Sequence, residues 1–216
     1  MLLLSIDTST VTVSVALYDG SAVRAEQRTV ESMSHGELLT PTIARVLADG
    51  GATAEQLTDI AVGVGPGPYT GLRVGVVTAL TLGYSLGIAT HGVCSIDPLG
   101  FEVAQELRPN SEFIAATDAR RKEVYWARFD ATGLRIGEPQ VDKPEAVASL
   151  GLPVFGRGGQ LHAGKLDWRE GPLDPSAGVM AELVATGQAR ELPLEPLYLR
   201  IPDAVPQSVT PVAGKV

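Results

Sequence analysis

The longest apolar stretch of the chain, residues 61–87, dominates its hydrophobic pattern. An apolar strand at 61–64 runs into Gly65-Pro66-Gly67-Pro68, a turn that neither a helix nor a central strand tolerates. A helix is predicted from there to the end of the stretch, with Thr70 as its N-cap. Because this helix is apolar on every side and carries Arg73 as its only charge, we expect all of its sides to be covered.

Small residues recur along the same predicted helix at Gly71, Gly75, Ala79 and Gly83. Glycine costs a helix about 1 kcal/mol relative to alanine, so this row indicates close approach by another backbone. Two interpretations are open: a central helix buried in its own domain, or a helix with one face on its own sheet and the other on a second protein chain. A membrane span is disfavoured, because the segment is short of about 20 apolar residues and has an arginine in its first turn.

The rest of the pattern alternates between strands and helices. Ser34 and Glu37 form a capping box for one of the helices, and Pro41 either kinks that helix or begins a second one capped by Thr40. The expected strands are 2–6, 11–17, 22–30, 88–93, 113–117 and 124–129, and the expected helices are 34–49, 95–110 and 177–187.

Two halves of the chain show the same order of elements. Asp7 and Asp19 bracket the first hairpin 12 positions apart, and Asp118 and Asp130 bracket another hairpin at the same spacing. Later in each half an apolar strand runs into Gly-x-Gly. We therefore predict two related lobes, residues 1–108 and a smaller lobe 109–216 that ends in a mobile tail.

Composition restricts the class of protein. The 216 residues are 44% apolar and 19% charged, which is typical of a globular chain. The net charge of −8 disfavours nucleic-acid binding by this chain alone, and the basic run 120–122 is too short for a convincing track. The single cysteine, Cys94, excludes an intrachain disulfide, and the start MLLLSID lacks the basic region of a signal peptide, so we expect a cytoplasmic protein.

Two loops have the residue types of a phosphate site. Small hydroxyl residues and glycine amides can surround an anion, and a helix N-terminus favours one. The alternative is two tight turns that face each other with nothing bound. The residues of this degenerate phosphate cradle are Asp7, Thr8, Ser9, Thr10, Gly65, Gly67, Thr70 and Gly71.

Metal and nucleophile chemistry has little support in the sequence. His35, His91 and His162 are scattered, with no partner at ligand spacing, and Cys94 has no nearby histidine. The run 118–122 is read as a solvated hairpin turn that could otherwise hold an anion.

Several segments, in order and with matching spacing, resemble the TsaB family. They are IDTST, HGELLTPTI, GPGPYTGLRVGVVTALTLGYSLGI, GVCSID, DARRKEVYWARF and PLYLR-x-PDA. The resemblance implies an α/β protein with the actin-like ATPase fold, in two lobes with mixed sheets flanked by helices. TsaB proteins are accessory subunits in bacterial synthesis of threonylcarbamoyladenosine (t6A), at position 37 of tRNAs that read codons starting with A.

The same resemblance implies a chain without a catalytic or metal site. The related subunit TsaD carries a metal-binding His-x-Glu-x-His after a Gly-Val pair, and here Ser95 and Leu99 stand at the two histidine positions. The expected partners are TsaD in a heterodimer, the ATPase TsaE at the TsaB–TsaD junction, and a second copy when the chain is alone. Contact with tRNA is expected only through these partners, and none with a membrane. No cofactor is expected, since ATP belongs to the partner subunits, although weak nucleotide binding is left open.

In the family, two helices pack against the equivalent helices of TsaD. We expect the corresponding residues here to form the interface with TsaD or with a second copy: His35, Glu37, Leu38, Leu39, Thr42, Ile43, Val46, Leu72, Arg73, Gly75, Val76, Ala79, Leu80 and Gly83.

An enzyme of the same fold is the alternative. A small-molecule kinase or ATPase would use Asp7 and Asp118 as metal-associated carboxylates, with 154–159 as its adenosine site. A metallopeptidase is the third possible function, and the sequence lacks the metal ligands that it would need.

Overall fold

The apolar runs form two mixed sheets in the computed structural model, which describes residues 1–30 and 35–200. Among these residues, one sheet has the strand order β10-β5-β4-β1-β2-β3 and the other has the order β8-β7-β6-β9. The strands are β1 (Leu3–Asp7), β2 (Thr12–Tyr18), β3 (Val23–Val30), β4 (Asp59–Gly65), β5 (Ala89–Cys94), β6 (Phe113–Asp118), β7 (Val124–Phe129), β8 (Arg135–Asp142), β9 (Val154–Phe155) and β10 (Glu191–Leu192).

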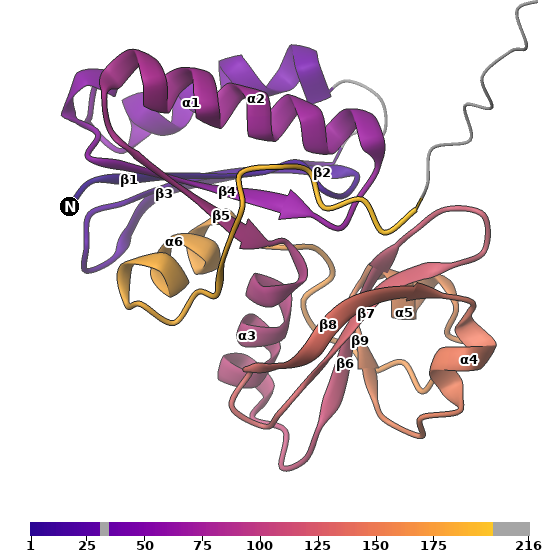
Figure 1. Ribbon diagram of the computed structural model, residues 1–216. Helices are drawn as coiled ribbons and strands as arrows, with labels where there is room; N and C mark the ends of the chain where they lie inside the picture. The colour runs from indigo at the N-terminus through magenta and orange to yellow at the C-terminus, as the bar shows by residue number, and fades with distance from the viewer. Residues whose placement is uncertain (31–34, 201–216) are drawn as a thin grey trace, which may run out of the picture.

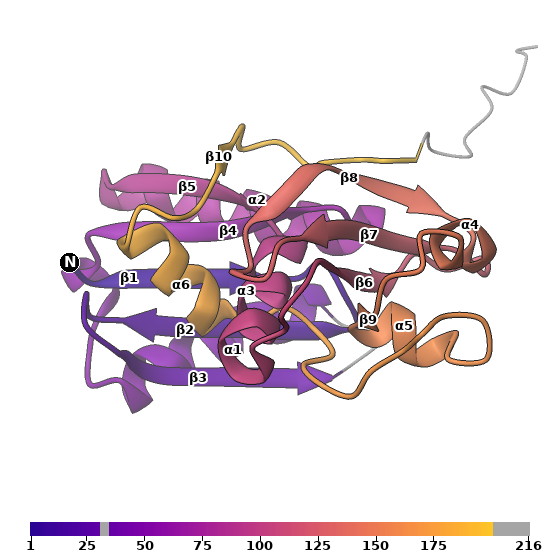
Figure 2. The ribbon, with the colours of Figure 1, turned by 90° about the horizontal axis from the view of Figure 1, so that it is seen from below.

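Helices cover both faces of the first sheet (Figure 1). α1 and α2 pack on one face, while α6 and α3 lie on the other, and α3 also packs on the second sheet. Figure 2 shows the strands of the two sheets from below, with α3 between them. The helices are α1 (His35–Asp49), α2 (Tyr69–Leu86), α3 (Ile96–Leu107), α4 (Pro144–Ala148), α5 (Arg157–Leu161) and α6 (Ala177–Ala185), with a 3-10 turn at Ala54–Gln56.

The predicted duplication is confirmed by the strand pairing. In each sheet a hairpin (β1–β2, β6–β7) is antiparallel, a third strand (β3, β8) continues it antiparallel, and a later strand (β4, β9) pairs parallel with the first. The expected division at residue 108 separates the two hairpins. After the second sheet, however, the chain returns to the first one, where α6 packs on β1 and β2 and β10 pairs with β5. The segment 177–192 therefore lies on the first sheet rather than in a second lobe 109–216.

The predicted starts of α2 and of a second helix at Thr40 are wrong, and the predicted start of α1 at Ser34 lies outside the described residues. α2 begins one residue before Thr70, because the Pro68 carbonyl already accepts the first helical hydrogen bond, from Leu72 N at 3.0 Å. α1 is a single helix that contains Pro41, so Thr40 caps no second helix. Ser34 and the tail after residue 200 lie outside the described residues.

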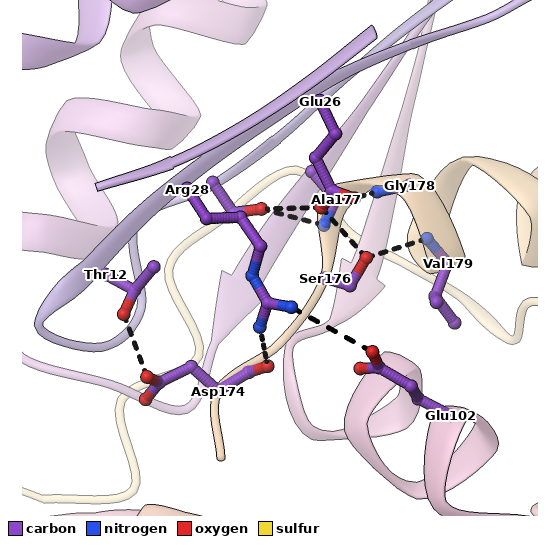
Figure 3. A network of polar contacts seen from close by, with 10 residues as sticks. Thr12, Glu26, Arg28, Glu102, Asp174, Ser176, Ala177, Gly178 and Val179 are labelled. Atoms are coloured by element: carbon purple, nitrogen blue, oxygen red, sulfur yellow. Dashed lines mark hydrogen bonds and ion pairs between the residues drawn. The ribbon is translucent and has the colours of Figure 1, made fainter. Parts of the chain in front are cut away.

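A buried polar network joins α6 and the segment before it to β2 and β3 (Figure 3). The Glu26 carboxylate accepts from Ser176 Oγ (2.9 Å) and from Gly178 N (3.3 Å) at the start of α6. Ser14 Oγ accepts from Ala177 N at 2.9 Å. Thr12 and Ser14 on β2 are polar and buried. Their burial is tolerated because the network satisfies their hydrogen bonds.

The same network reaches α3 through Arg28. Its guanidinium donates to the Asp174 carbonyl at 2.6 Å and lies 3.9 Å from Glu102 Oε1 (Figure 3). Burial of the Glu102 carboxyl raises its pKa from 4.5 to about 7, against the attraction of Arg28. The contribution of this carboxyl to folding stability is therefore full below about pH 4.5 and is lost as the pH rises through about 7.

Glu102→Gln tests this pH dependence. We expect the variant to be more stable than the wild type by about 1–2 kcal/mol near pH 8, where the buried carboxyl would be charged, and to differ little near pH 5. Urea denaturation at both pH values measures the difference. The exposed Glu106 supplies the control, Glu106→Gln. A Glu102→Gln variant that loses stability equally at both pH values would contradict the assigned cause.

Candidate functional site

The turn after β1 and the loop before α2 meet face to face, as the sequence suggested. Thr8 Oγ1 donates to the Gly71 carbonyl at 2.7 Å, which ties the turn to the first turn of α2. A Cβ atom on Gly67 would lie 2.5 Å from the Ser9 carbonyl oxygen, and a Cβ on Gly71 or Gly75 would lie closer than 3.0 Å to an oxygen of Thr8. The two turns are therefore in direct contact.

This contact corrects the phosphate-cradle interpretation. The glycine faces that an anion would approach are already packed against the chain's own turn, in which Thr8 and Ser9 are fully buried. Thr70 is exposed on the outer side of the helix. Gly65 has a φ of 114° and is covered by the Leu197 carbonyl, so its backbone also faces the chain itself. The residues that resemble a cradle form a close-packed turn-to-helix junction.

Asp7 lies at the centre of this junction and is 1% exposed. Its Oδ1 accepts from Ser9 N at 2.9 Å and from Ser9 Oγ at 2.7 Å. Its Oδ2 packs against Gly63, where a Cβ atom could not fit. Burial raises the pKa of the Asp7 carboxyl to about 6, although hydrogen bonds from the neighbouring serines lower it in part. Oδ1 is thus held by its own turn, whereas the buried Oδ2 has no hydrogen-bond partner among the described residues.

The second candidate carboxylate, Asp118, lies at the end of β6 and is held by its own hairpin turn. Its Oδ1 accepts from Arg120 N at 2.8 Å, and its Oδ2 lies 3.6 Å from Arg120 Nε. Asp7 and Asp118 each stand in the last rung before the hairpin turn, opposite Ser14 and Val124 respectively.

The glycine element of the second lobe is also closed. A Cβ on Gly156 or Gly158 would lie closer than 3.0 Å to the carbonyls of β6. Arg157 between them forms an ion pair with the buried Asp174. The 154–159 segment therefore packs on its own sheet, and the adenosine site expected from it is not formed by these glycines.

The apolar helix α2 is covered on one side and exposed on the other. Its small-residue row faces inward: Cβ atoms on Gly75 and Gly83 would collide with Thr8 and Thr90. Its outward positions recur at a spacing that keeps them within one side of a helix with 3.6 residues per turn. We call them the α2 strip: Tyr69, Arg73, Val77, Leu80 and Tyr84.

The α2 strip is unusually exposed for apolar side chains. Val77 is 60% exposed and Tyr84 is 92% exposed, whereas Val76, the residue next to Val77 on the inward side of α2, is 2% exposed. Of the expected interface residues, Glu37, Arg73 and Leu80 are exposed and His35, Leu38 and Thr42 are half-buried. The others are buried in the chain's own core and cannot reach a partner: Leu39, Ile43, Val46, Leu72, Gly75, Val76, Ala79 and Gly83.

Val77, Tyr84 and Tyr69 were missed as interface candidates. The glycine row indicated that another backbone approaches one side of α2, but the sequence left open whether that backbone belongs to this chain or to a partner. In the structure the row packs on Thr8 and Thr90, so the exposed positions lie on the other side of the helix.

The positions of the histidines and the cysteine give no metal cluster. Within residues 1–30 and 35–200 no three His, Cys, Asp or Glu side chains gather closely enough to hold an ion. His35 Nε2 lies 2.7 Å from the Thr10 carbonyl, and His91 lies between Glu191 (2.7 Å) and Asp59 (3.3 Å). Burial raises the pKa of the Cys94 thiol, which leaves it protonated at neutral pH.

Ser95 and Leu99, the positions that the family resemblance aligns with metal-binding histidines, are both buried. Ser95 Oγ accepts from Gly65 N at 3.1 Å, and Leu99 belongs to the core between α3 and the second sheet. Both side chains are thus part of the packing.

None of the helices in the described part of the chain is long and apolar enough to cross a bilayer.

Comparison with known proteins identifies the family. A family model described as TsaD, tRNA N6-adenosine threonylcarbamoyltransferase, matches residues 27–179. An uncharacterised protein of Mycobacterium bovis is 38% identical over 216 residues, covering 95% of both chains. An uncharacterised Mycobacterium leprae protein is 40% identical, but this chain spans only 56% of its length.

Named relatives and solved structures agree. The tRNA threonylcarbamoyladenosine biosynthesis protein TsaB of Escherichia coli is 32% identical over 151 residues, 68% of this chain and 64% of that protein. YeaZ from Pseudomonas aeruginosa superimposes with a TM-score of 0.74 at 27% identity, covering 92% of this chain and 99% of YeaZ. Together with the duplicated mixed sheets, this confirms the expected α/β actin-like fold. The chain therefore belongs to the TsaB family, within the wider family that the TsaD model describes.

Proposed function

We propose that this chain is a non-catalytic subunit that binds TsaD and supports threonylcarbamoyl transfer to N6 of a tRNA adenosine. Its relatives named TsaB are tRNA threonylcarbamoyladenosine biosynthesis proteins. The observation that carries the proposal is the α2 strip, in which large apolar side chains are exposed on a helix whose opposite side is already packed. Exposed apolar surface of this kind is typical of protein interfaces.

The α2 strip also favours helix-to-helix contact. α1 lies beside α2 on the same face of the sheet, so a partner that docks there meets two helices (Figure 1). The resemblance to the TsaB family implies that this partner is TsaD, and that TsaE binds at the junction between TsaD and this chain. Without TsaD, a second copy of the chain can cover the same strip, since a twofold interface uses one patch twice.

A non-catalytic role is supported by the chemistry of the buried residues. Ser95 and Leu99 replace imidazoles that would bind a metal, and neither is a ligand for a transition metal. The closed junction around Asp7 leaves its carboxylate engaged with Ser9. On this proposal ATP acts in the partner subunits, and TsaD carries out the transfer.

Reconstitution tests the proposed function. TsaD from the same source, with tRNA and the threonylcarbamoyl adenylate, is expected to form t6A at a rate that rises at least about tenfold when this chain is added, because catalysis requires a competently held active site. This chain alone is expected to form none. Mass spectrometry of the digested tRNA measures the product. TsaD that is equally active without the chain would refute the proposal.

A kinase or ATPase of the same fold is the competing function. Low-micromolar ATP binding with turnover by the isolated chain, seen by calorimetry and phosphate release, would favour it. The packed glycines at both loops make that outcome unexpected.

A further inference from the structure

His91 lies between two carboxylates that come from different strands. Its Nδ1 is 2.7 Å from Glu191 Oε1 on β10, and its Nε2 is 3.3 Å from Asp59 Oδ1 on β4. Asp59 Oδ2 accepts from Thr58 Oγ1 at 2.6 Å, which leaves Oδ1 to face the imidazole. The histidine side chain is 22% exposed, so both interactions are partly shielded from water.

This arrangement fits the charged form of the histidine. A neutral imidazole carries a single N–H, so it can donate to one carboxylate and must present a lone pair to the other. The imidazolium has two N–H groups and donates to both. Burial opposes the charge, but hydrogen bonds with Glu191 and Asp59 outweigh it and raise the pKa of His91 above its ordinary 6.5. Protonated His91 therefore links β10 to β4 across the intervening β5.

His91 faces α6 rather than α2. Its neighbour Thr90 packs on Gly83 of α2, and successive strand residues point to opposite faces of a sheet. α6 covers that opposite face. Each helix has one charged residue, Arg73 on α2 and Glu182 on α6, and both are exposed. The two helices therefore add no buried charge beside the histidine.

β10 is a short strand at the edge of the first sheet (Figure 2). Its two residues, Glu191–Leu192, pair with residues 92–93 of β5. Arg190, just before the strand, forms an ion pair with Glu138 on β8, with 2.8 Å between Nη2 and Oε1. Because a backbone hydrogen bond contributes only about 1 kcal/mol net, a ladder of two residues is weak and an added ion pair matters to it.

The chain after β10 returns to the start of α2. Leu197 packs on the core of the first sheet, and its N donates to the Val64 carbonyl at 2.7 Å. The Tyr198 ring stacks on Tyr69, with centroids 4.9 Å apart. We call residues 191–198 the return segment. Since Tyr69 belongs to the α2 strip, the return segment connects β10 to one end of that strip.

We propose that His91 is a proton switch for the return segment: its imidazolium fixes β10 on the first sheet, and its neutral form holds β10 more loosely. The stabilisation is full below about pH 6.5 and is lost as the pH rises through the higher pKa of His91 in the folded chain. Histidine is the side chain whose ordinary titration falls in this range. The switch needs no partner, so the inference does not depend on the proposed function.

Glu102 also titrates near neutral pH but belongs to another part of the fold. Burial raises its pKa to about 7, and its ion pair with Arg28 joins α3 to β3. In the strand order β3 and β10 lie at opposite edges of the first sheet. An effect of Glu102 should therefore be the same in chains with and without His91, which separates the two titrations.

NMR and hydrogen exchange of the full chain test the inference. The His91 ring signals are assigned by their absence from His91→Gln, and their pKa is measured from about pH 5 to pH 9. Exchange of the peptide 189–198 is measured at about pH 6 and about pH 8.5 and corrected for the intrinsic pH dependence of amide exchange. Glu191→Gln removes the carboxylate on β10. The matched control is Glu195→Gln, at an exposed position in the same segment.

We expect the pKa of His91 to exceed 6.5, and to fall in Glu191→Gln but not in Glu195→Gln. In the wild type and the control, the peptide should exchange about two- to fivefold faster at the higher pH, as expected for one partly exposed ion pair. His91→Gln and Glu191→Gln should exchange equally fast at both pH values, close to the faster wild-type rate.

Three results would overturn the inference. The first is a pKa of His91 at or below 6.5, because the imidazolium would then be scarce at neutral pH. The second is wild-type exchange of the peptide that does not depend on pH, and the third is a pH dependence that persists in Glu191→Gln. The Glu191 side chain is 66% exposed, so this variant tests the switch without disturbing the core. Neither measurement involves TsaD, so failure here leaves the proposed function untouched.

Discussion

Val77→Glu is expected to weaken association with TsaD by about 3–5 kcal/mol, at least a hundredfold in Kd, while leaving the chain folded. Val77 is 60% exposed on the α2 strip, so a carboxylate there remains hydrated in the free chain. On docking, the same carboxylate would be buried against an apolar partner surface without a counter-ion. Isothermal calorimetry with purified TsaD measures the affinity, and sedimentation velocity measures self-association of the chain.

Two further substitutions separate an interface effect from general damage. Leu161→Glu places the same charge at an apolar side chain that is 57% exposed on α5, away from α2, and should leave the affinity unchanged. Val76→Glu would bury the charge in the chain's own core, since Val76 is 2% exposed, and should unfold the protein. Unchanged affinity of Val77→Glu for TsaD would exclude the α2 strip as the docking surface.

Gly71→Ala is expected to destabilise the chain by about 2–4 kcal/mol, although alanine is the better helix former. A methyl group there would lie closer than 3.0 Å to the Thr8 carbonyl oxygen, which belongs to the backbone and cannot rotate away. The hydrogen bond from Thr8 Oγ1 to the Gly71 carbonyl would be strained as well. Urea denaturation followed by circular dichroism gives the free energy of unfolding.

The matched control is the same substitution on the neighbouring helix. Gly36 lies in the first turn of α1 and is exposed, and among the described residues a Cβ there would meet only Val74 Cγ2, at 4.0 Å. Gly36→Ala should therefore stabilise the chain slightly, by up to about 1 kcal/mol. If both variants unfold at the same denaturant concentration, the junction between the 8–10 turn and α2 is looser than its geometry indicates.

Local sequence patterns were sufficient for most of the elements and their order, although β8, α4, α5 and β10 were not predicted. The apolar run after Thr58 predicted β4, the Gly-Pro turn and α2, and the repeated hairpins predicted two related sheets, which strand pairing confirms. These features depend on neighbours in sequence: hydrophobic periodicity, proline, glycine and turn residues act over a few positions. The family could be recognised for the same reason, because its motifs are continuous segments.

Which side of α2 faces outward was not predictable in this way. A helix that is apolar all round has no polar side to mark solvent, so Val76 and Val77 are equivalent in composition. Only the tertiary structure shows that Val76 packs in the core and Val77 does not. The glycine row likewise indicated a close backbone approach, but its neighbour is the chain's own Thr8 rather than a partner.

Contacts between residues far apart in sequence decided the rest. The Asp7 turn and the loop before α2 had the residue types of an anion site, with two facing turns as the alternative, and the fold packs them directly against each other. Arg73 and Tyr198 are 125 positions apart in sequence, and their hydrogen bond forms only because residues 193–200 return to the start of α2. Periodicity and turn chemistry determine elements, whereas faces and sites depend on long-range packing that local patterns do not encode.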